Sequence, residues 1–278
     1  MSKENTTQLA TLIGTKPGNL SQIMHNAAYQ YLGLNYRYIA LDISGIDGLE
    51  AAVNWMRATL NFRGSSVTMP YKKDIMRHLE RIDPVALEID AINTIVKEGR
   101  ALAGYNTDWI GAMEALKEET ELEGKTAAVA GAGGAANAIV YVLKQDNANV
   151  IVFNRNVARA EELAKKFGLE VGGSLDDIAN LRDYDILINA TPVGAYPNVN
   201  ESIVSEKALK EGKVVMDIVS KPSETKLLKM AQDRGCKIIP GYKMLVYQAV
   251  PQVELFTGRE VTRDVRKVME RAVVEALK

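Results

Sequence analysis

The sequence is poor in the residues that most often bind metals. Its 278 residues include one cysteine, Cys236, and two histidines. A single cysteine excludes an internal disulfide and any zinc or iron–sulfur site built from several thiolates. With so few ligands of either kind we predict no metal site, and we expect Cys236 to be a small buried residue.

An excess of charge of either sign is also missing. Lys and Arg number 34 and Asp and Glu 35, so the formal net charge is −1. This balance provides no basic surface to concentrate nucleic acid or an anionic membrane, so we expect neither as a partner and predict a small-molecule substrate. The first ten residues, MSKENTTQLA, lack the apolar core of a signal peptide, and no apolar run reaches membrane-spanning length. We therefore expect a cytoplasmic protein.

Short apolar runs alternate with helical patterns in two series along the chain. The first series extends from residue 9 to about 105 and includes LATLIGT, YRYIALDI and SSVTM. The second begins at KTAAVAGAGG and continues through NVIVFNR, DYDILINAT, KVVMDIV and CKIIPG. Such alternation predicts an α/β protein of two lobes with largely parallel sheets. Residues 242–278 indicate two helices with no strand after them, which we expect to pack back on the first lobe.

The stretch AAVAGAGGAANAIVYVL has the pattern of a dinucleotide-binding turn. A predicted strand over residues 126–130 leads into Gly131, Gly133 and Ala136 in the spacing G-x-G-x-x-A, and an apolar-periodic helix follows. Gly131 allows the tight turn, Gly133 lets the backbone approach a pyrophosphate, and Ala136 permits close packing of helix on strand. The helix N-terminus then faces the anion.

The end of the next strand, NVIVFNRNVARA, indicates which nucleotide is bound. An NAD site usually carries an acidic residue there for the ribose hydroxyls, whereas this chain has Asn154 and Arg155, with Arg159 one turn later. A guanidinium can bind a 2′-phosphate bidentately. We therefore predict NADP as the cofactor.

Two other stretches offer groups for proton transfer. GSSVTMPYKK places Lys72 and Lys73 at the start of a predicted helix, where a lysine opposes the helix dipole. ALAGYNTDWIGAM places Thr107 and Asp108 at another helix start, where either could simply be an N-cap. Taken together, a lysine and an aspartate on strand-to-helix loops of one lobe could form an ion pair that sets the amine for proton transfer.

The sequence resembles the shikimate dehydrogenase family over about residues 12–258. The resemblance rests on motifs in the family's order and spacing: LSQIMHNAAYQYLGLNYRY, VTMPYKK, AINTIV, GYNTDWIGA, GAGGAA, NRNVARA, INATPVGA, DIVSKPSET and GYKMLVYQAVPQVELFTG. It implies an amino-terminal substrate-binding domain, residues 1–106 completed by 242–278, and a Rossmann NADP-binding domain, residues 107–241. It also implies an NADP-dependent oxidoreductase that interconverts shikimate and 3-dehydroshikimate in aromatic amino acid biosynthesis, as a monomer or homodimer.

The resemblance also implies residue roles. Lys72 and Asp108 match the catalytic pair, and Lys73 should point about 100° away from Lys72 on a helix. The positions that match substrate-binding residues are Asn19, Ser21, Ser66, Thr68, Asn93 and Gln248. The positions that match cofactor contacts are Gly131, Gly133, Gly134, Ala135, Asn154, Arg155, Arg159, Thr191, Gly241 and Met244.

Three segments depart from the family's pattern in one pocket. The usual Ser-Leu-Ser-Pro segment has Asn19 in place of its first serine and Gln22 in place of its proline, with only Ser21 kept. The usual Asn of the NVT motif is Ser66, and a usual Tyr is Ser220. Serine and asparagine are thus exchanged between two segments that should face the substrate carboxylate, and both residue types can donate hydrogen bonds to it.

These departures leave alternatives open. One is a quinate or quinate/shikimate dehydrogenase, or a paralogue that takes an altered cyclic hydroxy acid, because a pocket built around hydrogen bonds discriminates strongly. Another is an NADP-binding sensor with little catalysis, although such a protein has no need of a proton-transfer pair. We expect His25 and Asn26 to be structural residues.

Overall fold

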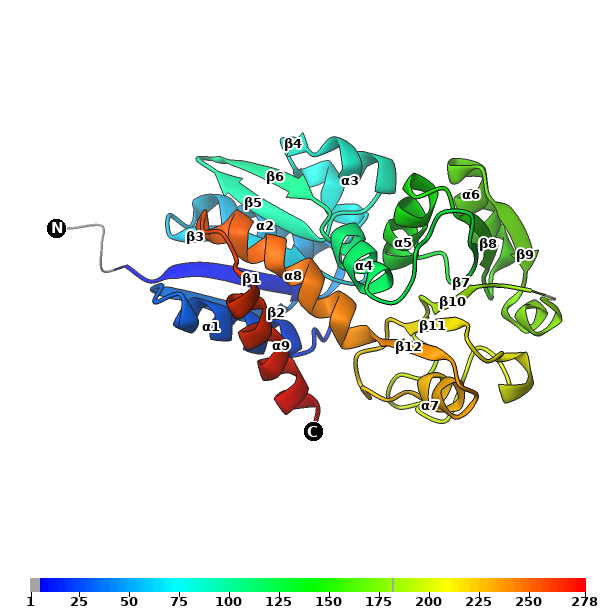
Figure 1. The fold of residues 1–278 in the computed structure, drawn as a ribbon. Coiled ribbons are helices and arrows are strands. Elements are labelled where there is room, and N and C mark those ends of the chain that lie inside the picture. Colours follow the sequence, from blue (N-terminus) through cyan, green and yellow to red (C-terminus); the bar gives the residue numbers. More distant parts are fainter. Residues whose placement is uncertain (1–5, 182) are drawn as a thin grey trace. The chain divides into compact units, whose positions relative to one another are not determined.

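The computed structural model describes residues 6–181 and 183–278 (Figure 1). The chain divides into two compact units. Unit 1 extends to Thr107 and resumes over Val246–Ala276, and unit 2 comprises Asp108–Leu245. Each unit contains a six-stranded sheet, so the predicted two-lobe α/β class is confirmed.

The sheet of unit 1 is mixed, with the strand order β2-β1-β3-β5-β6-β4. Its strands are β1 (Gln8–Gly14), β2 (Tyr36–Asp42), β3 (Phe62–Val67), β4 (Arg81–Ile82), β5 (Thr94–Glu98) and β6 (Ala101–Tyr105). Its helices before residue 108 are α1 (Leu20–Tyr31), α2 (Gly45–Ala58) and α3 (Pro84–Ile89). The sheet is largely parallel, as predicted, but not wholly so, because β5 pairs antiparallel with both β3 and β6. Only two residues, Gly99 at φ +65° and Arg100, join β5 to β6, and so short a loop can connect only antiparallel strands.

The segment after β3 also differs from the prediction. The strand ends at Val67, and residues 69–73 form turns rather than the start of a helix. A 3₁₀ helix of five residues, Asp74–His78, follows. Lys72 and Lys73 therefore lie in a turn, where they oppose no α-helix dipole.

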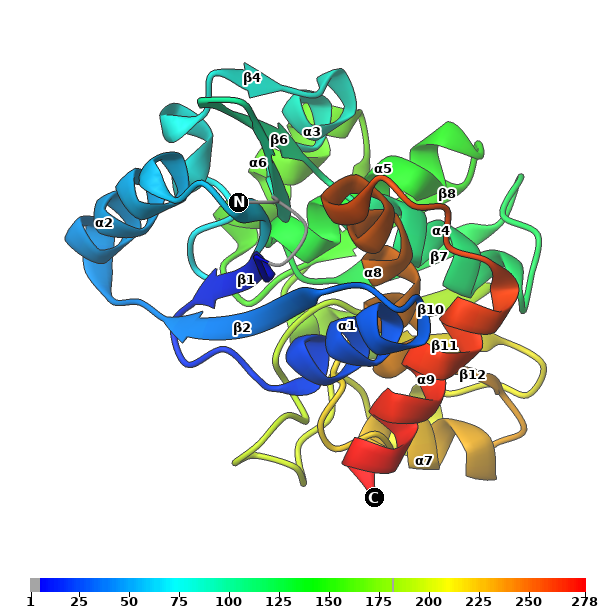
Figure 2. The same ribbon diagram turned by 90° about the vertical axis from the view of Figure 1, so that its left-hand side faces the viewer.

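The two helices predicted near the C-terminus are present as α8 (Gly241–Thr257) and α9 (Arg263–Leu277). From Val246 onward they belong to unit 1, and Figure 2 shows them alongside α1. The ring of Phe256 on α8 lies 6.2 Å from that of His25 on α1. The Arg266 guanidinium of α9 lies 5.0 Å above the Tyr247 ring.

The sheet of unit 2 is parallel throughout, with the order β12-β11-β10-β7-β8-β9. Its strands are β7 (Thr126–Ala130), β8 (Asn149–Phe153), β9 (Glu170–Gly173), β10 (Ile186–Asn189), β11 (Val214–Asp217) and β12 (Lys237–Pro240). Its helices are α4 (Asp108–Lys117), α5 (Gly134–Gln145), α6 (Val157–Phe167) and α7 (Lys226–Asp233), besides the first part of α8. The strand order reverses at β7, and in such sheets ligands bind beyond the carboxyl ends of the strands at the reversal.

None of the helices in the described part of the chain combines the length and the apolar character that crossing a membrane requires.

Candidate functional site

The loop after β7 has the geometry that the glycine spacing predicts. Gly131 has φ +121°, and a Cβ there would lie 2.7 Å from the Ala190 carbonyl oxygen, so only glycine fits. Its N–H donates to the Phe153 carbonyl over 2.7 Å. A Cβ at Gly133 would meet nothing within 4 Å, and Gly133 is the N-cap residue of α5. The backbone at the start of this twelve-residue helix is therefore open to an anion.

The end of β8 presents two cations to solvent. Arg155 and Arg159 are exposed, and neither forms an ion pair with any residue that the structure describes. The Asn154 amide donates to the Asn156 carbonyl over 2.8 Å, which closes the turn into α6. Two guanidinium groups at this edge of the sheet suit a phosphate ligand.

A buried asparagine and aspartate join the loops after β10 and β11. The Asn189 amide nitrogen donates to Asp217 Oδ1 over 2.9 Å, and Asn189 Oδ1 accepts from the Thr191 hydroxyl over 2.6 Å. Asp217 also accepts from the Val219 N–H and the Thr225 hydroxyl. Burial raises the pKa of Asp217 to about 6, against the opposing effect of these hydrogen bonds. Thr191 is thus held at the carboxyl edge of the sheet.

The start of α8 packs against the same edge of unit 2. A Cβ at Gly241 would lie 2.5 Å from the Val219 carbonyl oxygen, so glycine permits this close approach. Met244, one turn further, is 6 % exposed.

In unit 1, a hydrogen-bonded group brings together two of the predicted substrate-binding residues. The Asn93 amide nitrogen donates to Thr107 Oγ1 over 2.9 Å and to Gln248 Oε1 over 3.2 Å. Asn93 Oδ1 accepts from the Thr107 N–H over 2.7 Å. All three residues are buried. They connect the residue before β5, the segment after β6 and α8.

The two lysines of the turn after β3 have different surroundings. The carbonyl of Lys72 accepts from the Ile92 N–H over 2.7 Å, so the backbone of Lys72 is bound beside Asn93. The half-buried Lys72 thus differs from the exposed Lys73, whose Nζ is 2.7 Å from Asp90 Oδ2. Asp108 is buried, begins α4 and directly follows Thr107.

The predicted carboxylate-binding residues occupy two segments of unit 1. Asn19 is the exposed N-cap residue of α1 and makes no side-chain capping bond, and Ser21 lies half-buried in the first turn. The Thr68 N–H donates to the Ile13 carbonyl over 2.9 Å. Ser66 is buried, accepts from the Tyr38 hydroxyl over 2.6 Å and donates to Gln252 Oε1 over 2.8 Å.

Gln252 is a polar residue of this region that the sequence does not reveal as part of the site. It is 1 % exposed and lies on α8 four residues after Gln248. Positions four apart share one face of a helix, and this spacing is the signal that could have identified it.

His25 and Asn26 have structural surroundings, as expected. The His25 ring has no exposed surface, stacks on Tyr38 with the ring centroids 4.0 Å apart, and places Nδ1 2.8 Å from the Ser21 carbonyl. Asn26 binds both backbone polar groups of Tyr38 through its amide. Among the described residues, no three His, Cys, Asp or Glu side chains gather as metal ligands.

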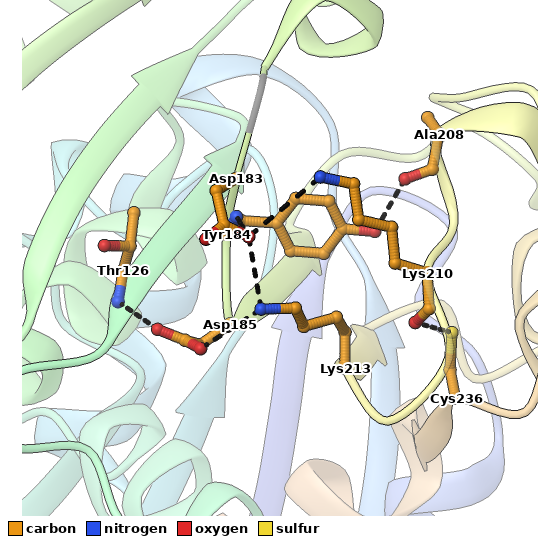
Figure 3. Close-up of polar contacts among 8 residues, drawn as sticks. All are labelled: Thr126, Asp183, Tyr184, Asp185, Ala208, Lys210, Lys213 and Cys236. Atoms are coloured by element: carbon orange, nitrogen blue, oxygen red, sulfur yellow. Dashed lines mark hydrogen bonds and ion pairs between the residues drawn. The ribbon is translucent and has the colours of Figure 1, made fainter.

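A polar cluster at the opposite edge of the unit 2 sheet is structural (Figure 3). Lys213 Nζ lies 3.2 Å from Asp183 and 3.3 Å from Asp185, and Asp185 accepts from the N–H of Thr126, the first residue of β7. The Cys236 thiol donates to a backbone carbonyl, and burial raises its pKa. The cluster lies at the amino-terminal ends of the strands, away from the edge where such sheets bind ligands.

The chain matches three family models. Residues 18–95 match the shikimate dehydrogenase substrate binding domain, residues 113–228 the shikimate / quinate 5-dehydrogenase model, and residues 241–274 the shikimate 5'-dehydrogenase C-terminal domain.

Individual relatives are similar over almost their whole length. Shikimate dehydrogenase (NADP(+)) of Methanocaldococcus jannaschii is 43 % identical over 270 residues, which are 93 % of each chain. The crystal structure of the Thermus thermophilus shikimate 5-dehydrogenase with NADP(H) and shikimate is 33 % identical, with a TM-score of 0.88 and coverage of 97 % of this chain and 100 % of that one. The ligand-free 5-ketofructose reductase of Gluconobacter sp. strain CHM43 is 30 % identical, with a TM-score of 0.85 and coverage of 98 % and 99 %.

Proposed function

This chain belongs to the shikimate dehydrogenase family, and from that premise we propose that it interconverts shikimate and 3-dehydroshikimate with NADP as its coenzyme. It is an oxidoreductase of the alcohol-to-ketone type. The observation that carries the proposal is the buried group of Asn93, Thr107 and Gln248. Lys72 is bound next to this group, because its carbonyl accepts from the N–H of Ile92, and Thr107 directly precedes Asp108 in the chain.

We assign NADP to unit 2 and the substrate to unit 1. The Gly131–Ala135 turn and the N-terminus of α5 would hold the pyrophosphate, because Gly133 leaves the backbone open there. Arg155 and Arg159 would bind the 2′-phosphate, with Asn154 shaping their turn. Thr191, Gly241 and Met244 line the same carboxyl edge and would contact the nicotinamide end.

Lys72 and Asp108 form the proposed proton-transfer pair. During oxidation Lys72 Nζ takes the proton of the substrate hydroxyl, and during reduction it returns that proton to the oxygen. Asp108 orients the amine and the substrate. When bound, NADP supplies the two-electron acceptor or donor for the carbon. The side chains of the protein keep their oxidation state throughout.

Recognition of the substrate falls to residues of unit 1. Asn93 and Gln248 bind ring hydroxyls, and Thr68 follows Val67, the last residue of β3, whose N–H donates to the Asn93 carbonyl over 2.8 Å. Ser21 and Asn19 stand at the N-terminus of α1, where backbone N–H groups favour a carboxylate.

The test is NADP reduction followed by its near-ultraviolet absorbance, with shikimate as the substrate. Lys72→Ala is expected to lower turnover by roughly 10²–10⁴, the usual range for a general acid–base group, with NADP affinity unchanged. Lys73→Ala is the matched control, because its amine already pairs with Asp90 at the surface, and it is expected to keep wild-type turnover. Equal losses in both variants would contradict the assignment of Lys72.

A second candidate is the reduction of a neutral polyhydroxy ketone. The similar 5-ketofructose reductase acts on a substrate of that kind by its name, and in this chain the carboxylate segment carries Asn19 while the proton of Ser66 is bound internally. Quinate stays an alternative acid. Parallel assays with shikimate, quinate and 5-ketofructose separate the three, since turnover of the ketone alone would exclude carboxylate recognition.

A further inference from the structure

Gln252 has a side-chain amide whose orientation is set by its surroundings. One end lies 3.4 Å from the Asn93 backbone carbonyl oxygen and 2.8 Å from Thr94 Oγ1. A carbonyl oxygen can only accept, so this end is the Nε2 donor. The opposite end, Oε1, is therefore the atom that faces Ser66, and it can only accept.

This orientation fixes the hydrogen bond in which the Ser66 hydroxyl uses its one proton. The Ser66 hydroxyl has to donate to Gln252 Oε1 over 2.8 Å. It accepts from the Tyr38 hydroxyl over 2.6 Å, and because burial raises the pKa of Tyr38, the phenol keeps the proton that it donates. Ser66 is left with one lone pair and no proton to offer, so it can accept from a substrate hydroxyl but cannot donate to a carboxylate.

The series of hydrogen bonds continues from the Gln252 amide to Asn93. Because Thr94 Oγ1 accepts from Gln252, its proton is directed to Asn93 Oδ1, 2.8 Å away. Asn93 Oδ1 also accepts from the Thr107 N–H. Because the Thr107 N–H fixes Asn93 Oδ1, the Asn93 amide nitrogen faces Gln248. One directed series of hydrogen bonds thus connects four chain segments, from Tyr38 to Asn93.

We propose that Gln252 is a positioning residue that sets substrate preference by withdrawing Ser66 from carboxylate binding. This inference rests on the proposed function, which places Ser66 and Asn93 against the substrate. It makes Ser66 an acceptor for a hydroxyl and leaves the carboxylate to the N-terminus of α1. Exchange of the usual asparagine for Ser66 thus changes the kind of group that is recognised.

The test compares shikimate with its methyl ester, which keeps the ring hydroxyls and loses the negative charge. Ser66→Ala is expected to leave the acid-to-ester ratio of kcat/KM within about twofold, since Ser66 gives no proton to the acid. Gln252→Met keeps the length of the side chain and releases that proton, so the ratio is expected to rise about tenfold in favour of the acid. The double variant Gln252→Met/Ser66→Ala should return to the wild-type ratio.

Ser65→Ala is the matched control for a purely structural effect. Ser65 is a buried serine beside Ser66 whose hydroxyl binds Thr11 and the Ser66 carbonyl, outside the series. It should lower stability without changing the acid-to-ester ratio. A fall of the ratio in Ser66→Ala, or an unchanged ratio in Gln252→Met, would overturn the proposal.

A measurement without turnover separates this proposal from the proposed function. A neutron map of the perdeuterated protein is expected to show deuterium between Ser66 Oγ and Gln252 Oε1 and on the Gln252 nitrogen that faces Thr94. The reversed amide would refute the inference even in an active enzyme. If the map agrees and the chain turns over neither acid nor ester, the proposed function fails while the assigned hydrogen-bond directions hold.

Discussion

The buried His25 should make unit 1 sensitive to mild acid. Its ring has no exposed surface and stacks on Tyr38. Burial lowers the pKa of His25 from 6.5 to about 4, with the hydrogen bond to the Ser21 carbonyl opposing part of the shift. Unfolding exposes the ring, which then takes up a proton at any pH between these values.

The sign and size of the effect follow from the two pKa values. The unfolded chain binds more protons than the folded one below pH 6.5, so the stability that neutral His25 provides is complete above pH 6.5 and declines as the pH falls toward 4. The complete loss amounts to about 3 kcal/mol, and about 2 kcal/mol of it is expected by pH 5. The variant His25→Phe, which keeps an aromatic ring against Tyr38 but cannot be protonated, should lack this loss.

Urea unfolding at pH 7.5 and pH 5 measures the difference. The sequence has two tryptophans, so a Trp109→Phe background leaves Trp55, which packs 5.4 Å from Phe62 and reports on unit 1. His78→Gln removes the other histidine and is the matched control, in which the loss should persist. If His25→Phe loses as much stability between the two pH values as the parent, protonation of His25 is not its cause.

Three further outcomes are expected in unit 2. Arg155→Ala should weaken binding of NADP at least about tenfold and leave NAD unchanged in fluorescence titrations, because only the 2′-phosphate loses a partner; equal weakening of both would contradict this. Gly131→Ala should lower the free energy of unfolding by about 1–3 kcal/mol and abolish tight NADP binding, because Gly131 has a positive φ and a Cβ there would meet the Ala190 carbonyl. Gly133→Ala, whose Cβ would have open space around it, should keep the wild-type melting temperature. Burial raises the pKa of Asp217 above its unfolded value of 3.8 to about 6, so its contribution to stability is complete below pH 3.8 and lost as the pH rises through 6. When unfolding of unit 2 is followed by Trp109 fluorescence, the free energy of unfolding of the parent should therefore rise by about 1 kcal/mol from pH 7 to pH 5. Asp217→Asn should show no such rise. A rise of the same size in both proteins would exclude Asp217 as its source.

Features with local causes were predictable from the sequence. The predicted strand has the bounds that the structure shows, Thr126–Ala130, and the predicted helix follows it. A buried parallel strand is a nearly continuous apolar run, and the turn after it requires glycine, so both are visible in the sequence. The place of Arg155 and Arg159 after β8 was also predictable, because it depends only on their distance along the chain from that turn. The family resemblance is confirmed along with the NADP coenzyme.

Features with long-range causes were not predictable in the same way. The hairpin of β5 and β6 adds one antiparallel strand, β5, to a series that otherwise alternates, and the five-residue 3₁₀ helix after Lys73 is too short to show a helical period. Gln252 lies in a helix whose pattern resembles core, and its partner Ser66 is 186 residues away. Nothing near either residue in the sequence indicates that one accepts the proton of the other.

The division of α8 between the two units has a consequence for biosynthesis. Unit 1 begins the chain but includes residues from Val246 onward, so the ribosome must complete unit 2 before unit 1 has all its parts. At about 5–20 residues per second, Gln252 is added about 10–40 s after Ser66. During that interval the nascent strands of unit 1 lack the helix that covers them, whereas unit 2 can fold. A chain stopped before residue 246 should therefore retain a folded unit 2 and be a target for chaperones and proteases through its unfinished first sheet.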